Sequence, residues 1–128
     1  MIIEQLSIFL NNSLGRLSEV TGVLGNEGIN MKAFTLSESS DFGLLKIITD
    51  DTAKALSVLK RHGFAVSSSK VVLIDLEGDT PGSLSIILKR ISDLGISVES
   101  MYAFSTFDGA KAVIQTDDIE RCNKTLMK

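Results

Sequence analysis

The chain has 128 residues, of which 44% are hydrophobic and 23% are charged, a composition typical of a globular protein. This length allows one ordinary domain or two very small ones. The net charge of −3 argues against nucleic-acid binding, which depends on Lys and Arg side chains that neutralise phosphates. The single cysteine, Cys122, excludes an internal disulfide, and spacings typical of metal ligands are absent.

The N-terminal segment and the apolar runs bear on localisation. The first ten residues, MIIEQLSIFL, lack the basic start and the small-residue cleavage site of a signal peptide. No apolar run approaches the roughly 20 residues that a membrane span requires. We therefore expect a cytoplasmic protein with no membrane partner, no nucleic-acid partner and no cofactor.

The chain opens with a predicted strand and helix. Residues 3–10 alternate apolar and polar side chains, which is typical of a strand. Ser13 stands where a helix N-cap is expected. An apolar stripe at helical spacing follows, formed by Leu17, Val20 and Leu24. Gly28 predicts the end of this helix, because glycine readily adopts the left-handed conformation.

Two strands, a helix and a third strand are predicted next. Residues 29–38 predict a strand, residues 39–43 a turn, and residues 44–49 a second strand. A Thr-Asp-Asp sequence then opens a helix with an aspartate as its cap, and Arg-His-Gly at 61–63 ends it. The last strand is expected at 64–68.

The same pattern recurs 67 residues later. Residues 15–61 align with 82–128 without a gap, and 11 of the 47 positions are identical, against roughly three expected by chance. Thr80 is the expected N-cap of the second copy, and Pro81 the first helical residue. The second apolar stripe is formed by Leu84, Ile87 and Ile91. We infer a duplicated supersecondary unit.

The order β-α-β-β-α-β in each copy is that of a ferredoxin-like, split βαβ unit. We predict an α+β fold in which two such units, at 1–69 and 70–128, each place their helices on one face of an antiparallel sheet. The counterpart of the strand at 64–68 would fall beyond Lys128, so the second unit lacks its last strand. Three alternatives remain open: a truncated chain, an open sheet edge, or an edge filled from elsewhere.

The glycines near the helix starts are the first candidates for a binding function. Gly15 and Gly82 are expected one residue inside their helices, where glycine is a poor helix former. A missing side chain would let an anion approach the backbone N–H groups at the helix start. Close packing of helix on sheet is the alternative reason for a glycine, and on the residues alone we favour it.

Other polar residues have structural explanations that compete with functional ones. Asn30 opens the second strand and could bind the ammonium or carboxylate of a zwitterion, but an asparagine bonded to a turn is the favoured explanation. Ser97 holds the matching position in the second copy. The four aspartates that form two adjacent pairs are better explained as helix caps than as paired catalytic carboxylates; they are Asp50, Asp51, Asp117 and Asp118.

Nothing in the sequence predicts catalysis. His62 lies in a last helical turn, where a cation complements the helix dipole, and Cys122 aligns with Ala55 as a small packing residue. The remaining methionines and aromatic residues are expected in a core or interface; they include Met31, Phe34, Met101, Tyr102 and Phe104. Phe9, whose expected counterpart is Leu76, is the one aromatic candidate for RNA stacking.

The helix-start glycines, the Gly-Ile-Asn-Met and Gly-Ile-Ser-Val segments and the βαββαβ order together resemble the ACT domain. The whole chain, apart from the absent last strand, is similar to small stand-alone proteins made of two ACT domains. The resemblance implies a regulatory or sensor protein that is not an enzyme. It also implies a small L-amino acid bound where two ACT units meet, and it now favours the glycines as positions of ligand approach.

The resemblance implies ligand contacts from the loop before the first helix and from the start of the second strand. In the first copy these residues are Asn11, Asn12, Ser13, Leu14, Gly15, Arg16, Asn30 and Met31. In the second copy they are Asp79, Thr80, Pro81, Gly82, Ser83, Ser97 and Val98. Binding is expected to change the association of a homodimer or the activity of a metabolic enzyme. The alternatives are a ligand-free interaction or dimerisation module and, by analogy of fold alone, an acylphosphatase-like enzyme.

Overall fold

The computed structural model describes residues 1–11, 13–38, 41–76, 81–106 and 109–126. In chain order its elements are β1 (Ile2–Asn11), α1 (Arg16–Asn26), β2 (Met31–Glu38), β3 (Phe42–Thr49), α2 (Thr52–Arg61), β4 (Ala65–Leu76), α3 (Ser83–Asp93), β5 (Val98–Thr106), β6 (Gly109–Thr116) and α4 (Ile119–Leu126). This is the predicted α+β order, repeated. The chain forms two compact units, which we name the first unit (Glu4–Ser69) and the second unit (Met1–Ile3 with Lys70–Lys128).

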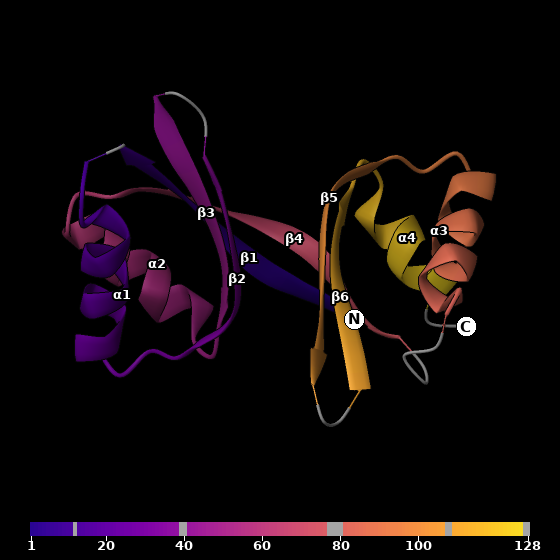
Figure 1. Cartoon of the computed structure of the whole chain (residues 1–128), viewed down its shortest axis with the longest axis horizontal. Helices are drawn as coiled ribbons and strands as arrows, with labels where there is room; N and C mark the ends of the chain where they lie inside the picture. Colours follow the sequence, from indigo (N-terminus) through magenta and orange to yellow (C-terminus); the bar gives the residue numbers. More distant parts are fainter. Residues whose placement is uncertain (12, 39–40, 77–80, 107–108, 127–128) are drawn as a thin grey trace. The chain divides into compact units, whose positions relative to one another are not determined.

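The first unit is an antiparallel sheet of order β2-β3-β1-β4 with α1 and α2 on one side of it (Figure 1). β1 pairs with β3 so that Leu6 faces Ile47 and Leu10 faces Gly43. Alternate residues of the strands and the apolar stripe of each helix meet in one core. Its buried members are Leu6, Ile8, Leu10, Val20, Leu24, Ile29, Leu45, Ile47, Ala55, Val58, Leu59 and Phe64. Burying each large apolar side chain contributes about 1.5–3 kcal/mol, so this core holds the helices on the sheet.

The second unit repeats this arrangement with the strand order β5-β6-β4-β1, and α3 and α4 lie on one side of β5 and β6 (Figure 1). β4 pairs with β6 so that Leu76 faces Ala110, and β5 pairs with β6 so that Tyr102 faces Val113. The buried members of its core are Val72, Ile74, Leu76, Ile91, Ile96, Ala110, Ala112, Ile114 and Cys122. Of the predicted stripes, Val20 and Leu24 of α1 and all three residues of α3 therefore face cores, whereas Leu17 is exposed.

The two units share strands. The predicted strand at 64–68 and the first strand of the second unit are one continuous strand, β4, which leaves the first unit at Ser69 and enters the second at Lys70. The N-terminal residues Met1–Ile3 belong to the second unit, where Met1 takes the place beside β4. The Met1 amine donates to the Leu73 carbonyl oxygen at 3.0 Å, and the Leu73 N–H donates to the Met1 carbonyl oxygen at 2.8 Å.

Of the three alternatives for the last strand of the second unit, the structure shows an edge filled from elsewhere. The occupant is the start of the chain itself, which β1 carries from the second unit into the first. Strand sharing satisfies backbone groups of Leu73 that would otherwise lie at a free sheet edge.

One counterpart was misassigned in the sequence. Leu76 faces Ala110 as Leu10 faces Gly43, and both leucines are buried, so Leu76 corresponds to Leu10. Phe9 corresponds instead to Asp75, because each pairs with the next residue along the neighbouring strand. The stretch of sequence from Leu76 to Gly82 is therefore one residue longer than that from Leu10 to Gly15, and the ungapped alignment cannot be extended back into the strands.

Candidate functional site

The helix starts differ from the prediction in a way that matters for binding. Gly15 and Gly82 are the N-cap residues of α1 and α3, not residues inside the helices, and their φ angles are 85° and 86°. Ser13 and Pro81 precede these caps. The left-handed conformation is open to glycine and unfavourable for residues with a Cβ, so the backbone alone requires glycine here.

Close packing of helix on sheet does not explain these glycines. A Cβ placed on Gly15 or Gly82 would meet no heavy atom within 4 Å. Within the described residues, no side chain caps either helix. The two helix starts thus have open space beside their glycine caps, which would let a small anion approach a helix N-terminus.

The loop before α1 is organised by its own backbone. The Ser13 N–H donates to Asn11 Oδ1 at 3.2 Å, and the Arg16 N–H donates to the Ser13 carbonyl oxygen at 3.3 Å. Leu14, between them, is fully exposed. The predicted site residues Asn12, Asp79 and Thr80 lie outside the described residues, and Pro81 is exposed in the turn before α3.

Arg16 is engaged within the first unit. Its Nη1 donates to Glu19 Oε2 at 2.8 Å, and its guanidinium carbon lies 4.5 Å from the centre of the Phe64 ring. The position of Arg16 is therefore set by an ion pair and a cation–π contact. In the second unit Ser83 holds this place, so the two helix starts differ in charge and size, as their sequences predict.

The residues that precede β2 and β5 are held in the same way. The Asn30 N–H donates to Asp50 Oδ1 at 3.0 Å, and the Asp50 N–H donates to the Asn30 carbonyl oxygen at 3.1 Å. In the second unit Ser97 and Asp117 make the same two bonds, at 3.0 and 3.3 Å. Both strand starts are exposed, so the side chains of Asn30 and Ser97 face solvent.

These bonds correct the assignment of the aspartate pairs. Asp51 is the cap of α2, as predicted, because its Oδ1 accepts from the Lys54 N–H at 3.1 Å. Asp118 similarly accepts from the Arg121 N–H at 3.3 Å. Asp50 and Asp117 are not caps: each reaches back to a strand start 20 residues earlier. Only contacts between segments distant in sequence could reveal that role.

A pocket of about 310 Å³ lies in the second unit, at the start of α3. It brings together two of the predicted site residues, Gly82 and Ser83, but neither Ser97 nor Val98. Its other walls are Leu76, Leu84, Ala103, Phe104, Ser105 and Ala110. These residues were missed as site residues because they look like ordinary positions of strands and, for Leu84, of a helical stripe; Phe104 in particular was expected in a core or interface.

The residues after the strand starts have different surroundings. Met31 is half-buried against the core of the first unit, whereas its counterpart Val98 is exposed. In each strand the pairing register shifts just after this residue, between Met31 and Ala33 and between Val98 and Ser100. Each shift is a bulge or irregularity beside a predicted ligand contact.

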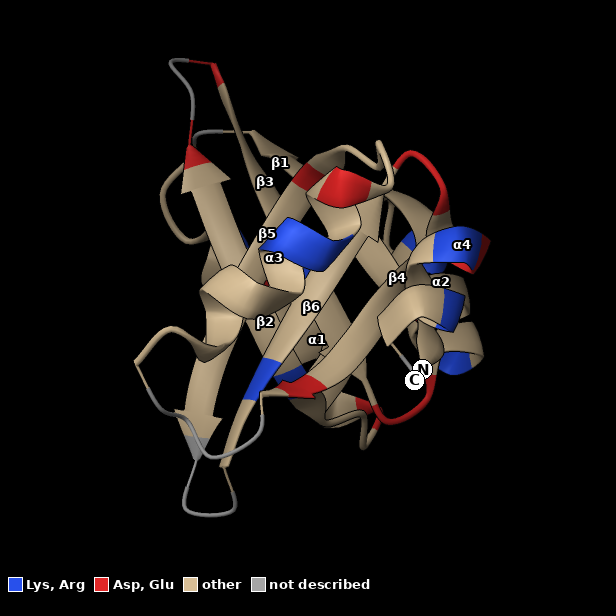
Figure 2. Cartoon of the chain, turned by 90° about the vertical axis from the view of Figure 1, so that its right-hand side faces the viewer, with Lys and Arg blue, Asp and Glu red and all other residues tan. Residues whose placement is uncertain are grey.

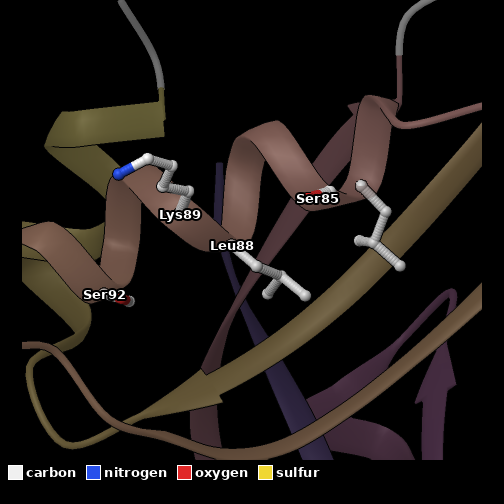
Figure 3. Close-up of a pocket in the computed structure, with 5 residues that line it drawn as sticks. Ser85, Leu88, Lys89 and Ser92 are labelled. Carbon is white, nitrogen blue, oxygen red and sulfur yellow. The ribbon is translucent and has the colours of Figure 1, made fainter.

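A larger hollow of about 540 Å³ runs along α3 and is lined by Leu84, Ser85, Leu88, Lys89 and Ser92. Figure 3 shows Leu88 reaching from the helix toward the strands, with Lys89 on the other side of the helix. Lys89 pairs with Asp93 at 3.1 Å, and Figure 2 shows further basic residues along α3 and α4. None of the residues that line this hollow along α3 is a predicted ligand contact.

The other reactive side chains have structural surroundings. Nδ1 of His62 lies 2.9 Å from the Val58 carbonyl oxygen at the end of α2. Cys122 is buried in the core of the second unit, and this burial raises the pKa of its thiol. Among the residues that the structure describes, no cluster of His, Cys, Asp and Glu could hold a metal ion. None of the helices in the described ranges is long and apolar enough to span a bilayer.

The fold recurs in solved structures. A protein from Bacteroides thetaiotaomicron is 41% identical, with a TM-score of 0.93 over 99% of this chain and 88% of that one. The ligand-free regulatory subunit of aspartate kinase from Thermus thermophilus is 14% identical, with a TM-score of 0.71 over 99% of this chain and 95% of that one.

Aspartokinase III from E. coli, in complex with lysine and aspartate, has a TM-score of 0.55 at 16% identity, and the match covers 98% of this chain and 30% of that one. Likeness at such low identity shows a shared fold. No curated protein sequence matches the chain. The family model that describes an ACT domain pair matches residues 1–128, the whole sequence, and the protein therefore belongs to the ACT domain pair family.

Proposed function

We propose that the protein is a regulatory sensor, without enzymatic activity, that binds a small L-amino acid at a glycine-capped helix start. The observation that carries this proposal is the pair of left-handed glycine caps, Gly15 and Gly82, with open space where a Cβ would stand. A carboxylate at this place would accept hydrogen bonds from the first-turn amides and would be favoured by the helix dipole.

The strand starts supply the second half of the proposed site. The Asn30 side chain can accept a hydrogen bond from an ammonium group or donate one to a carboxylate. The Ser97 hydroxyl can also accept and donate, but it has one donor where the asparagine amide has two. In the second unit, the apolar walls of the pocket at Gly82 suit an apolar ligand side chain. Asn12, Asp79 and Thr80 remain proposed contacts on the ground of the family alone.

We further propose that the site is completed by an ACT unit of a second chain in a homodimer. Apolar side chains lie exposed around the start of α1 and along β2 of the first unit: Leu14, Leu17, Phe34 and Leu36. Apolar surface of this kind is buried when a partner packs on it. Ligand shared between two chains would favour one packing over another, and this shift is how binding would become a signal.

The target of the signal is proposed to be a metabolic enzyme. The structural neighbours include a regulatory subunit of aspartate kinase and a complete aspartokinase bound to lysine and aspartate. Those proteins support the idea of a regulatory module that acts on an enzyme, either as a separate subunit or as part of its chain.

A thermal-shift screen against the common L-amino acids at millimolar concentration tests the proposal. A ligand at 100 times its Kd stabilises the folded protein by about 2.7 kcal/mol, which is a readily measured shift in Tm. We expect one amino acid or a chemically related group to raise Tm. A flat response across the whole panel would contradict the amino-acid function.

The same screen with Asn30→Ala and Ser97→Ala locates the site. Each change removes an exposed side chain but keeps the backbone bonds to Asp50 or Asp117. We expect one or both variants to lose the shift while the ligand-free Tm stays near the wild-type value. Asn26→Ala is the matched control, because it makes the same change at an exposed residue at the end of α1.

A ligand-free interaction module is the second candidate. The exposed side chains Leu14, Phe34 and Ile86 favour it, because they would also suit a protein partner or dimerisation without any ligand. Sedimentation of the protein with and without the amino-acid panel separates the two functions. Association that is strong and indifferent to every amino acid would favour the interaction module.

A further inference from the structure

Two aspartates that neither cap a helix nor pair with a described cation repeat their contacts in both units. Asp50 Oδ1 accepts from the Asn30 N–H at 3.0 Å, and Asp117 Oδ1 accepts from the Ser97 N–H at 3.0 Å. The backbone N–H of each aspartate returns a bond to the carbonyl oxygen of the same partner. The sequence around the strand starts differs between the units, yet both bonds are kept.

Helix capping does not account for these aspartates. The neighbouring residues Asp51 and Asp118 already accept from the first-turn amides of α2 and α4. What Asp50 and Asp117 add is a ring of two hydrogen bonds that satisfies both backbone groups of the residue just before β2 or β5. With its backbone held at both groups, that residue has its Cα–Cβ direction set by the start of the following helix.

We propose that Asp50 and Asp117 are positioning residues that hold the strand starts where the side chains of Asn30 and Ser97 meet the ligand. The inference rests on the proposed amino-acid function and adds residues that do not touch the ligand. Loss of either aspartate would free the strand start that it holds. The affinity for the ligand would then fall, because binding would have to order this segment and orient its side chain.

The first unit holds its strand start more firmly. Lys54 Nζ donates to the carbonyl oxygen of Glu27, the C-cap of α1, at 2.8 Å. Asp50 and the first turn of α2 thus contact the connection between α1 and β2 at Asn30 and at Glu27, respectively. The corresponding pair in the second unit is Arg121 and Leu94, and there Arg90 instead donates to the Thr125 carbonyl oxygen at 2.7 Å. We therefore expect Asn30 to be the better ordered of the two strand starts.

Asp50→Ala, Asp50→Asn and Asp51→Ala form the test set. The first readout needs no ligand: it is the hydrogen-exchange rate of the Asn30 amide, followed by NMR in the full chain. Alanine removes the acceptor and is expected to speed exchange about tenfold, whereas asparagine keeps an oxygen acceptor and is expected to restore slow exchange. Asp51→Ala removes the cap of α2 and should leave the Asn30 amide protected.

The second readout is the half-saturating concentration of each amino acid of the L-amino-acid panel in the thermal-shift assay. Asp50→Ala is expected to raise it about tenfold if the first unit binds the ligand, and Asp50→Asn to return it close to the wild-type value. Asp117→Ala, followed at the Ser97 amide, makes the same comparison in the second unit and replaces Asp50→Ala if that variant fails to fold.

Three results would overturn the positioning role. These are an Asn30 amide that exchanges at the wild-type rate in Asp50→Ala, an equal effect from Asp51→Ala, or faster exchange with unchanged affinity in both Asp50→Ala and Asp117→Ala. If the wild-type protein binds no amino acid of the panel, the proposed function fails by itself. The exchange rates at Asn30 and Ser97 then still decide whether the aspartates hold the strand starts.

Discussion

Gly15 and Gly22 permit a matched test of backbone conformation at the residue scale. Both are exposed glycines, and a Cβ on either would meet no heavy atom within 4 Å. Gly15 has a φ of 85° at the N-cap of α1, whereas Gly22 lies inside the helix. The same substitution should therefore change stability in opposite directions, since only the backbone distinguishes the sites.

Gly15→Ala places a Cβ in the left-handed conformation and is expected to lower the free energy of unfolding by about 1–2 kcal/mol. Gly22→Ala is expected to raise it by about 0.5–1 kcal/mol, because alanine loses less conformational entropy than glycine on forming a helix. Urea denaturation of the two variants beside the wild type measures both changes. Stabilisation by Gly15→Ala would contradict the left-handed cap before Arg16, and loss of stability in Gly22→Ala would contradict the place of Gly22 inside α1.

Cys122 gives a pH-dependent signal from the core of the second unit. Burial, the largest cause, raises the pKa of its thiol, while a hydrogen bond with Thr116 acts in the opposite direction. A raised pKa means that the folded state holds the proton more tightly than the unfolded state. The resulting stability is complete below the ordinary thiol pKa and is lost as pH rises through the folded-state pKa.

We therefore expect the unfolding free energy of the wild type, measured relative to Cys122→Ala, to be constant at neutral pH and to fall in the alkaline range. Subtracting the Cys122→Ala values at each pH removes the titration of all other groups. The same thiol should react slowly with a thiol reagent in the native protein and rapidly in urea. Equal rates in the two states would show that Cys122 is not buried in the core of the second unit.

At the scale of the element, local patterns predicted the helices well and their first residues poorly. The stripe Leu17, Val20 and Leu24 has the helical period, and in the structure Val20 and Leu24 are buried while Leu17 remains partly exposed. The N-cap was assigned to Ser13 because serine is a frequent cap, yet the chain turns into the helix at Gly15. A positive φ leaves no periodic signal in a sequence. The cap was therefore assigned from the general preference of serine for the N-cap position, and this assignment was wrong.

The aspartate pairs show the same limit. Capping depends on residues within one helical turn, and the prediction for Asp51 and its counterpart Asp118 follows from that local rule. Asp50 and Asp117 bond to residues 20 positions away, and an identical dipeptide gives no indication of which aspartate does so. Among the site residues, the contacts between distant segments were therefore the part that local patterns could not predict.

At the scale of the whole molecule, duplication made the fold predictable and strand sharing escaped prediction. The repeat implied two units of the same order, and the missing last strand was visible as a difference between the copies. The segment that fills the place of this strand could not be predicted, because Met1 and Leu73 are separated by 72 residues and no short pattern links them. The continuity of β4 from Ala65 to Leu76 was missed for another reason, because the boundary between the two copies was placed inside it, at residues 69 and 70.

A chain that begins at Glu4 would test strand sharing. It lacks both hydrogen bonds to Leu73, each worth about 0.5–1.5 kcal/mol, and leaves the Leu73 backbone at a sheet edge. Amide exchange should quicken in the second unit, across Lys70–Leu76 and Gly109–Thr116, and change little in Phe42–Thr49 of the first. Met1→Ala is the control, because it keeps the backbone of Met1–Ile3. Unchanged exchange at Leu73 would mean that the N-terminal residues do not complete this sheet, whereas equal acceleration in both units would mean that they support the whole chain.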